Sequence, residues 1–127
     1  MEKHVRHIMH KGKEILLLDA RGLEEKEYLA AWDEMEQEFL KDRKGSLVLI
    51  DATGAAMTTA TVNRAKQMVA AGTAKGLPDK GSAFVGLSGL QKSTAQLVAK
   101  GMGLNAHFFA TVEEAKDWLV KQDEKRR

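Results

Sequence analysis

The stretch "GLSGLQKST", residues 86–94, contains the glycines, lysine and serines that a phosphate-binding loop needs. A P-loop has the pattern Gly, four residues, then Gly-Lys-Ser/Thr, and this sequence has Gln91 where the second glycine belongs. Backbone amides must wrap closely around the phosphates, and the Cβ of Gln91 would obstruct that approach. The pattern therefore does not predict a nucleotide site, and we expect no cofactor.

The first half of the same stretch is close to the serine-hydrolase elbow Gly-x-Ser-x-Gly, which would make Ser88 a nucleophile. Leu90 replaces the last glycine of that motif, and the only downstream histidine, His107, falls in a predicted strand. We expect the two glycines to allow a tight turn from a strand into a helix, with Ser88 or Ser93 as the cap. No residue is predicted to be catalytic.

A second candidate site is the segment "DATGAAMTTAT", which follows the apolar run Leu47–Ile50. Ligands of open α/β sheets bind at the carboxyl ends of the strands, where helix N-termini present positive potential. One edge of the sheet should therefore gather the ligand-binding or phosphoacceptor candidates. These are Asp51, Thr53, Thr58, Thr59, Thr61 and Ser88, which Asp19 and Arg21 could join. The alternative is structural, with Asp51 capping the turn and the threonines capping the helix.

His4, His7 and His10 have a spacing that would suit metal ligands on a helix. Their segment predicts a strand instead, where side chains alternate and His7 faces away from the other two. The sequence has no cysteine, which excludes disulfides, thiolate zinc sites and cysteine catalysis. We expect no metal site.

Four continuous apolar runs predict the strands that position these residues. They are Ile15–Leu18, Leu47–Ile50, Ala83–Leu87 and Ala106–Phe109. Such runs are typical of parallel strands that are covered on both faces. A hairpin that turns at Lys11-Gly12-Lys13 precedes them.

Helical periodicity between and after the strands predicts four helices, each with an apolar stripe. The stripes are Tyr28, Trp32, Met35 and Phe39; Val62, Ala65 and Val69; Leu90, Leu97 and Val98; and Ala115, Trp118 and Leu119. Gly101 is expected to close the third helix, and Thr111 with Glu114 predicts a capping box for the fourth. The fold class is therefore α/β: a single domain with an N-terminal β-hairpin leading into a mostly parallel sheet of about five strands and about four helices.

The composition is that of a globular protein, with 43% hydrophobic and 30% charged residues. We expect one domain over residues 1–127, with residues 121–127 as a frayed basic tail. Neither a signal-peptide core nor a membrane-spanning run is present, which favours a cytoplasmic protein. The net charge of +2 and the 6% of aromatic residues do not favour nucleic-acid binding.

The segments "LVLIDATG", "AFVGLSGLQK" and "FFATVEEAKDWL" together resemble the SpoIIAA-like family of small bacterial proteins, which is related to STAS domains. The resemblance spans nearly the whole chain and implies a regulatory or binding role, because STAS domains dock onto partners or sense small ligands. Some relatives are grouped with lipid-binding modules. The anti-sigma-factor antagonists among them are phosphorylated on a serine of Asp-Ser-Ser-Gly. This sequence has "MTTATV" in that region, so Thr58, Thr59 and Thr61 are the possible acceptors.

We therefore expect a non-enzymatic regulatory or binding domain. It would dock a protein partner or a small anionic or lipid-like ligand at the carboxyl edge of the sheet. The alternatives are a phosphorylation-switched protein with a threonine acceptor and a small serine hydrolase using Ser88. A homodimer is a further expectation, because twofold dimers are the commonest oligomers.

Overall fold

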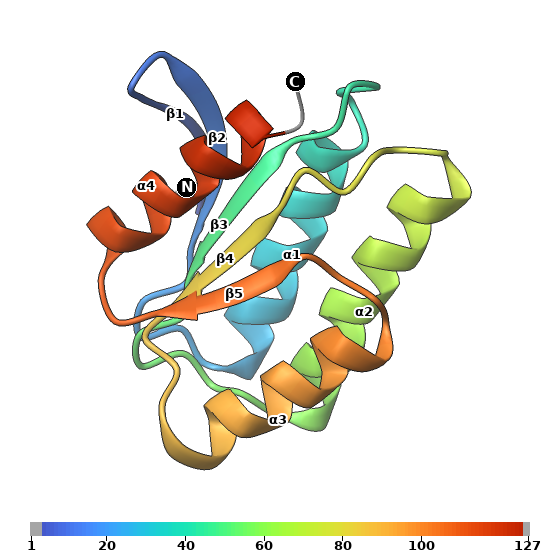
Figure 1. The fold of residues 1–127 in the computed structure, drawn as a ribbon. Helices are drawn as coiled ribbons and strands as arrows, with labels where there is room; N and C mark the ends of the chain where they lie inside the picture. Colours follow the sequence, from blue (N-terminus) through green and yellow to red (C-terminus); the bar gives the residue numbers. More distant parts are fainter. Residues whose placement is uncertain (1–3, 126–127) are drawn as a thin grey trace.

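The computed structural model describes residues 4–125, which form a five-stranded sheet with helices on both faces (Figure 1). The strands lie side by side in chain order. They are β1 (Val5–His10), β2 (Lys13–Asp19), β3 (Leu47–Asp51), β4 (Ser82–Val85) and β5 (Ala106–Phe109). β1 pairs with β2 in antiparallel orientation, and the other neighbours are parallel. The predicted fold class, with its hairpin and mostly parallel sheet, is confirmed.

Each parallel strand is followed by a helix. The helices are α1 (Glu25–Phe39), α2 (Thr59–Ala74), α3 (Gly89–Gly101) and α4 (Val112–Lys125). The first three cover one face of the sheet, and α4 crosses the other face (Figure 1). None of the helices described in residues 4–125 is long and apolar enough to cross a membrane.

The β1–β2 hairpin turns at the predicted place. Lys11 and Gly12 both have positive φ, at 50° and 80°, as two-residue hairpin turns require. The register pairs His10 with Lys13 across this turn. A short turn of this kind fixes the pairing of the two strands.

The apolar runs of β2 and β3 supply two core layers at once, because successive strand side chains point to opposite faces. One layer faces α1 and α2 and contains Leu16, Leu18, Val48 and Ile50 together with Tyr28, Trp32, Met35 and Met68. The other layer faces α4 and contains Ile15, Leu17, Leu47, Leu49, Ala83, Ala115 and Leu119. This division explains why the runs are continuous rather than alternating.

The helix α3 differs from the stripe that the sequence predicted. Leu90 and Leu97 are 83% and 72% exposed, and the one buried residue of α3 is Ala99. Gly101 is the last residue of the helix, as expected, and Gly103 follows the C-cap residue with a φ of 69°. The N–H groups of Gly103 and Leu104 bond to carbonyls of the last turn, as in a Schellman-type cap.

The C-terminal segment also differs from expectation. Residues 121–125, which we expected to fray, continue α4. An ion pair of 2.9 Å between Lys13 Nζ and Asp123 Oδ2 joins this part of the helix to β2. The last two residues of the predicted tail lie outside the described residues.

Candidate functional site

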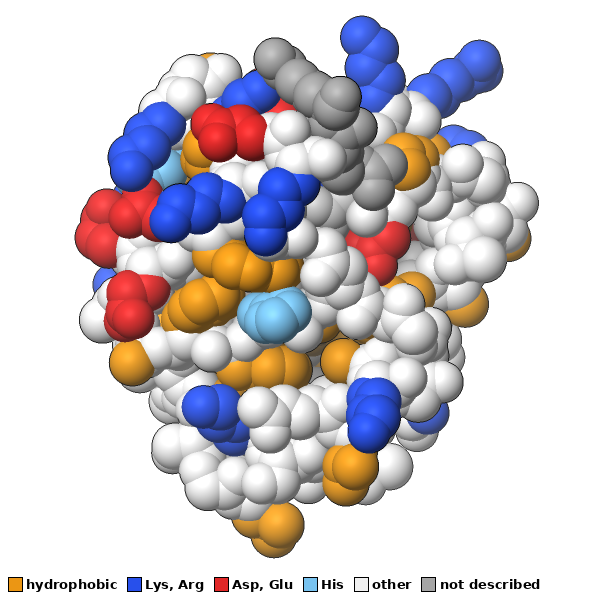
Figure 2. Space-filling view, in the orientation of Figure 1, with side chains coloured by type: hydrophobic (Ala, Val, Ile, Leu, Met, Phe, Trp, Pro, Cys, Tyr) orange, Lys and Arg blue, Asp and Glu red, His pale blue; other side chains and the backbone are white. Residues whose placement is uncertain are grey.

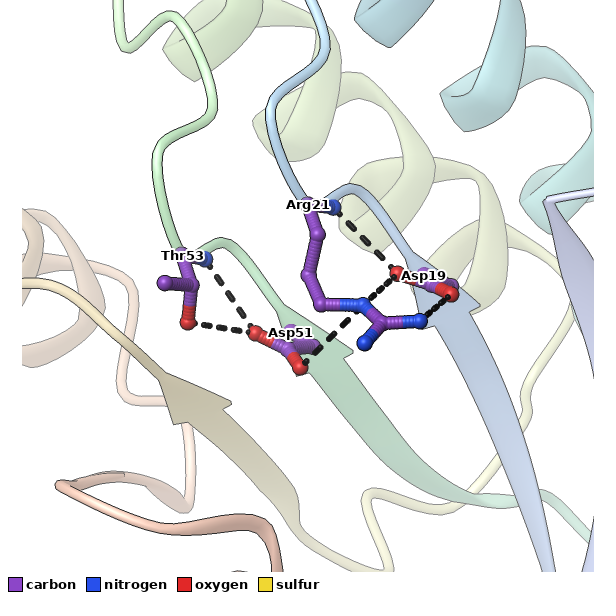
Figure 3. A network of polar contacts seen from close by, with 4 residues as sticks. All are labelled: Asp19, Arg21, Asp51 and Thr53. Carbon is purple, nitrogen blue, oxygen red and sulfur yellow. Dashed lines mark hydrogen bonds and ion pairs between the residues drawn. The ribbon is translucent and has the colours of Figure 1, made fainter.

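The carboxyl edge of the sheet holds the polar cluster that the sequence predicted around Asp51 (Figure 3). Asp19 and Asp51 end β2 and β3 and are paired in the parallel register. Arg21 donates from Nε and Nη2 to the two carboxylate oxygens of Asp19, at 2.9 and 2.8 Å. The same Nε lies 4.0 Å from Asp51 Oδ2. Thr53 donates to Asp51 Oδ1 from its backbone N–H at 3.2 Å and from its hydroxyl at 2.7 Å.

The polar groups of this cluster form hydrogen bonds and an ion pair with one another. The hydrogen bond from Arg21 holds the pKa of Asp19 below its usual value, and the same bond raises the pKa of Arg21. Two carboxylates face one guanidinium, and this excess of negative charge opposes the binding of an anion. The geometry favours the structural alternative for Asp51, in which it fixes the turn after β3.

Gly86 shows what the glycines of "GLSGLQKST" do. Its φ is 87°, and a Cβ at this position would overlap Thr53 Oγ1 and lie 2.6 Å from Thr53 Cα. The close approach is therefore to another loop of the same chain, and Gln91 lies within α3. The loop does not form the phosphate cradle of a P-loop.

The three candidate acceptor threonines occupy different environments at the start of α2. Thr58 and Thr61 form a capping box: Thr61 N–H donates to Thr58 Oγ1 at 3.2 Å, and Thr58 N–H donates to Thr61 Oγ1 at 2.9 Å. Thr61 is buried, and its hydroxyl donates to the carbonyl oxygen of Thr58 at 3.0 Å. Thr59 is exposed at the first position of the helix. Among these residues, Thr59 is the most accessible to a kinase.

Ser88 and His107 do not come together. Ser88 is the exposed N-cap residue of α3 and its side chain makes no capping hydrogen bond. The ring of His107 packs against Trp118 of α4, with ring centroids 4.6 Å apart, on the other face of the sheet. This separation does not favour the hydrolase interpretation.

His7 and His10 of the hairpin each contact a carboxylate. His7 Nδ1 lies 3.0 Å from Glu14 Oε1, and His10 Nε2 lies 2.7 Å from Asp117 Oδ1. Within residues 4–125, no three His, Cys, Asp or Glu side chains are placed to hold a metal ion.

A different site lies between the sheet and the helices α1, α2 and α3. It is an apolar cavity of about 90 Å³. Phe84 and Phe108 of neighbouring strands line it and stack with ring centroids 5.3 Å apart. Small side chains leave the space open where larger ones would fill it. The alanines that line the cavity are Ala52, Ala55, Ala65, Ala95 and Ala99.

Two aromatic residues of α1, Tyr28 and Trp32, belong to this lining. Trp32 is 2% exposed, and its Nε1–H finds no acceptor among the described residues. Tyr28 lies beside it, with ring centroids 5.8 Å apart. Burial raises the pKa of the Tyr28 hydroxyl to about 12, and the Trp32 N–H, which is near the phenol oxygen but outside hydrogen-bond geometry, opposes part of this rise. Tyr28 therefore stays neutral at physiological pH, when it can both donate and accept a hydrogen bond.

Side-chain hydrogen bonds and ion pairs fix some of the helices around the cavity more firmly than others. Arg64 of α2 bonds to Asp33 at 2.8 Å and to Glu36 at 3.0 Å, which ties α2 to α1. Lys75 adds a bond of 3.1 Å to the carbonyl oxygen of Leu40. No side-chain hydrogen bond or ion pair in the described part of the chain joins α3 to another element. Of the three helices over the cavity, α3 is the one with the fewest restraints.

Sequence reasoning assigned Tyr28 and Trp32 to the core and did not identify the cavity. Both residues are indeed buried. The available signal was that a tryptophan on an apolar stripe needs an acceptor for its N–H. A second signal was the series of alanines where a tightly packed core would carry larger side chains.

Comparison with solved structures shows similarity to the crystal structure of an uncharacterised protein from the DUF3478 family with a SpoIIAA-like fold from Shewanella loihica PV-4. The TM-score is 0.66 at 19% sequence identity, and the similarity covers 91% of each chain. No protein-family model matches the chain, and a comparison with curated proteins gives no match. The chain therefore has a SpoIIAA-like fold, as the sequence resemblance predicted, and at this level of identity the likeness concerns the fold alone.

Proposed function

We propose that the protein is a non-enzymatic binding protein that holds a small lipid-like molecule in the cavity beneath α3. The observation that carries this proposal is the apolar cavity lined by the buried indole of Trp32, whose N–H lacks an acceptor among residues 4–125. A buried donor without a partner costs about 1–3 kcal/mol. A bound molecule with a hydroxyl, carbonyl or carboxylate oxygen would remove that cost.

The lining indicates the chemistry of the ligand. Apolar side chains make up nearly all of it, so the body of the ligand is a hydrocarbon chain or ring. Lys66 of α2 is exposed and also belongs to the lining, which places a cation near the opening. An anionic end group at this opening would be attracted by Lys66. A single-chain amphiphile satisfies both features.

The size of the cavity requires α3 to move when a longer chain binds. An apolar cavity of about 150 Å³ holds one benzene molecule, and this cavity of about 90 Å³ is smaller. The sparse restraints on α3 make it the helix that can shift. The SpoIIAA-like fold supports a binding role in general, because resemblance to that group implies ligand or partner docking.

Calorimetric titration with matched ten-carbon ligands tests the proposal. We expect saturable binding of decanol and decanoate, and weaker binding of decyltrimethylammonium, which has no acceptor and is repelled by Lys66. Trp32→Phe should weaken decanol binding about two- to tenfold, because a net hydrogen bond contributes about 0.5–1.5 kcal/mol. Trp118→Phe is the matched control on the other face of the sheet, and it should leave the affinity unchanged.

Two results would count against the proposal. One is the absence of saturable binding of any of the three ligands to the wild-type protein. The other is an equal loss of affinity in Trp32→Phe and Trp118→Phe, which would place the ligand outside the cavity. Thermal unfolding of both variants checks that each one is folded.

A further inference from the structure

The outer face of α3 carries two exposed leucines and a lysine. Leu90 and Leu97 are 83% and 72% exposed. They are seven residues apart, which puts them two turns apart on one side of the helix, about 10 Å along its axis. Lys100 is exposed one turn after Leu97 and makes no ion pair with the described residues, whereas the half-buried Lys92 lies seven residues before the buried Ala99 and so belongs to the inner side. Leu90, Leu97 and Lys100 define the α3 surface.

The charge around the α3 surface is one-sided. Residues 52–112 contain six Lys or Arg but a single acid, Asp79, although the net charge of the whole chain is only +2. The helix α3 itself contains no acidic residue. Over the lower part of the molecule, where α3 lies, Figure 2 shows protruding hydrophobic side chains and blue Lys and Arg side chains but no red ones.

We propose that the α3 surface docks on an anionic lipid bilayer. Leucines that protrude beside a lysine suit a membrane interface, because the apolar side chains enter the acyl boundary while the ammonium group meets anionic headgroups. The inference rests on the proposed function, since the inner face of the same helix lines the cavity with Ala95, Val98 and Ala99. A helix that contacts the bilayer on one face and the cavity on the other lies between a membrane and the bound amphiphile.

A second copy of the chain is a less suitable occupant of this surface. A twofold dimer through α3 would bring the same patch of both copies together. Lys100 of both copies would then be brought to the same apolar contact, and no acid of α3 would offset the repulsion. The charge pattern therefore favours an anionic surface over self-association.

Co-sedimentation with vesicles tests the proposal. The wild-type protein should sediment with vesicles of phosphatidylcholine and phosphatidylglycerol mixed two to one, more weakly with phosphatidylcholine alone, and less as the ionic strength rises. Lys100→Gln should reduce partitioning roughly fivefold, from about 1 kcal/mol for one cation. Leu90→Gln/Leu97→Gln should reduce it about tenfold or more. Met9→Gln is the control, because Met9 is 66% exposed on β1, away from α3.

Three outcomes would overturn the inference. They are no binding of the wild-type protein to the mixed vesicles, equal binding of the leucine double variant, and a wild-type dimer in light scattering that this variant dissociates. Decanol titration in the absence of vesicles separates this inference from the proposed function. The lysine variant and the leucine double variant should both bind decanol like the wild type, so failure of vesicle binding with decanol binding intact refutes the docking alone.

Discussion

Replacing Ala95 by leucine should fill the cavity from the α3 side and block the ligand. Ala95 lines the cavity and is half-buried on the inner face of α3. The cavity of about 90 Å³ exceeds the roughly 10–15 Å³ that one water needs, so it has room for several heavy atoms. Leucine adds three carbon atoms to alanine, which this space can take. Both residues are good helix formers, so the backbone of α3 is not disturbed.

The expected gain in stability follows from the same geometry. Three buried carbons contribute up to about 2.4 kcal/mol at about 0.8 kcal/mol each, and fixing the leucine side chain costs about 0.5–1 kcal/mol. The free energy of unfolding without ligand should therefore rise by up to about 1.4–1.9 kcal/mol, or roughly 5–7 °C in Tm. Decanol affinity should fall at least tenfold, because the added side chain occupies the site.

Denaturant unfolding and calorimetric titration measure these two effects. Ala70→Leu, at an exposed position of α2 that does not line the cavity, is the matched control and should change neither quantity strongly. Ala65→Leu fills the cavity from the α2 wall and guards against a local clash at Ala95. If Ala95→Leu and Ala65→Leu both bound decanol with wild-type affinity, the ligand would have to bind elsewhere and the reasoning would fail.

Other predictions follow from the edge of the sheet and the helix ends. Gly86→Ala should destabilise the fold by about 2–5 kcal/mol, because the residue has a positive φ and the added Cβ would overlap Thr53. Gly89→Ala has open space around it and should cost about 1 kcal/mol, as measured by denaturant unfolding. Thr58→Ala should cost about 1 kcal/mol by removing the cap of α2, and an unchanged midpoint of unfolding would contradict this. Hydrogen bonds from His10 and Lys11 lower the pKa of Asp117 from 3.8 to about 2. The ionised Asp117 therefore stabilises the fold fully above pH 3.8, and this stabilisation is lost as the pH falls through about 2. Unfolding curves recorded across that window should show a smaller acid loss for Asp117→Asn than for the wild type.

The strands and the layer order could be predicted because a short continuous apolar run in a globular chain is best accommodated by a strand that is buried on both faces. The runs at Leu47–Ile50 and Ala106–Phe109 coincide with β3 and β5 to within one residue. The predicted α3 stripe was wrong at Leu90 and Leu97, although Val98 does face the cavity, and the error has a physical reason. Periodicity identifies a face that recurs along a helix, but it does not show whether other elements cover that face. In α3 the covered face contains Ala95 and Ala99, while Leu90 and Leu97 face outward.

The candidate site was predicted only in part. Parallel topology brought Asp51 and Thr53 to the edge as expected, together with Asp19 and Arg21. The topology alone could not predict the hydrogen bonds among these four residues, because those bonds depend on the loop geometry that Gly86 permits. The cavity depends on differences in volume between packed elements, which are set by side chains from several segments and leave no periodic pattern.

The central claim, that an amphiphile binds in the cavity beside Trp32, is tested most directly by the proton NMR signals of the two indole N–H groups. Titration with decanol should shift the Trp32 signal downfield as its N–H gains an acceptor, and the Trp118 signal should stay in place. A Trp32 signal that does not move at saturating decanol, or equal movement of both signals, would contradict the account.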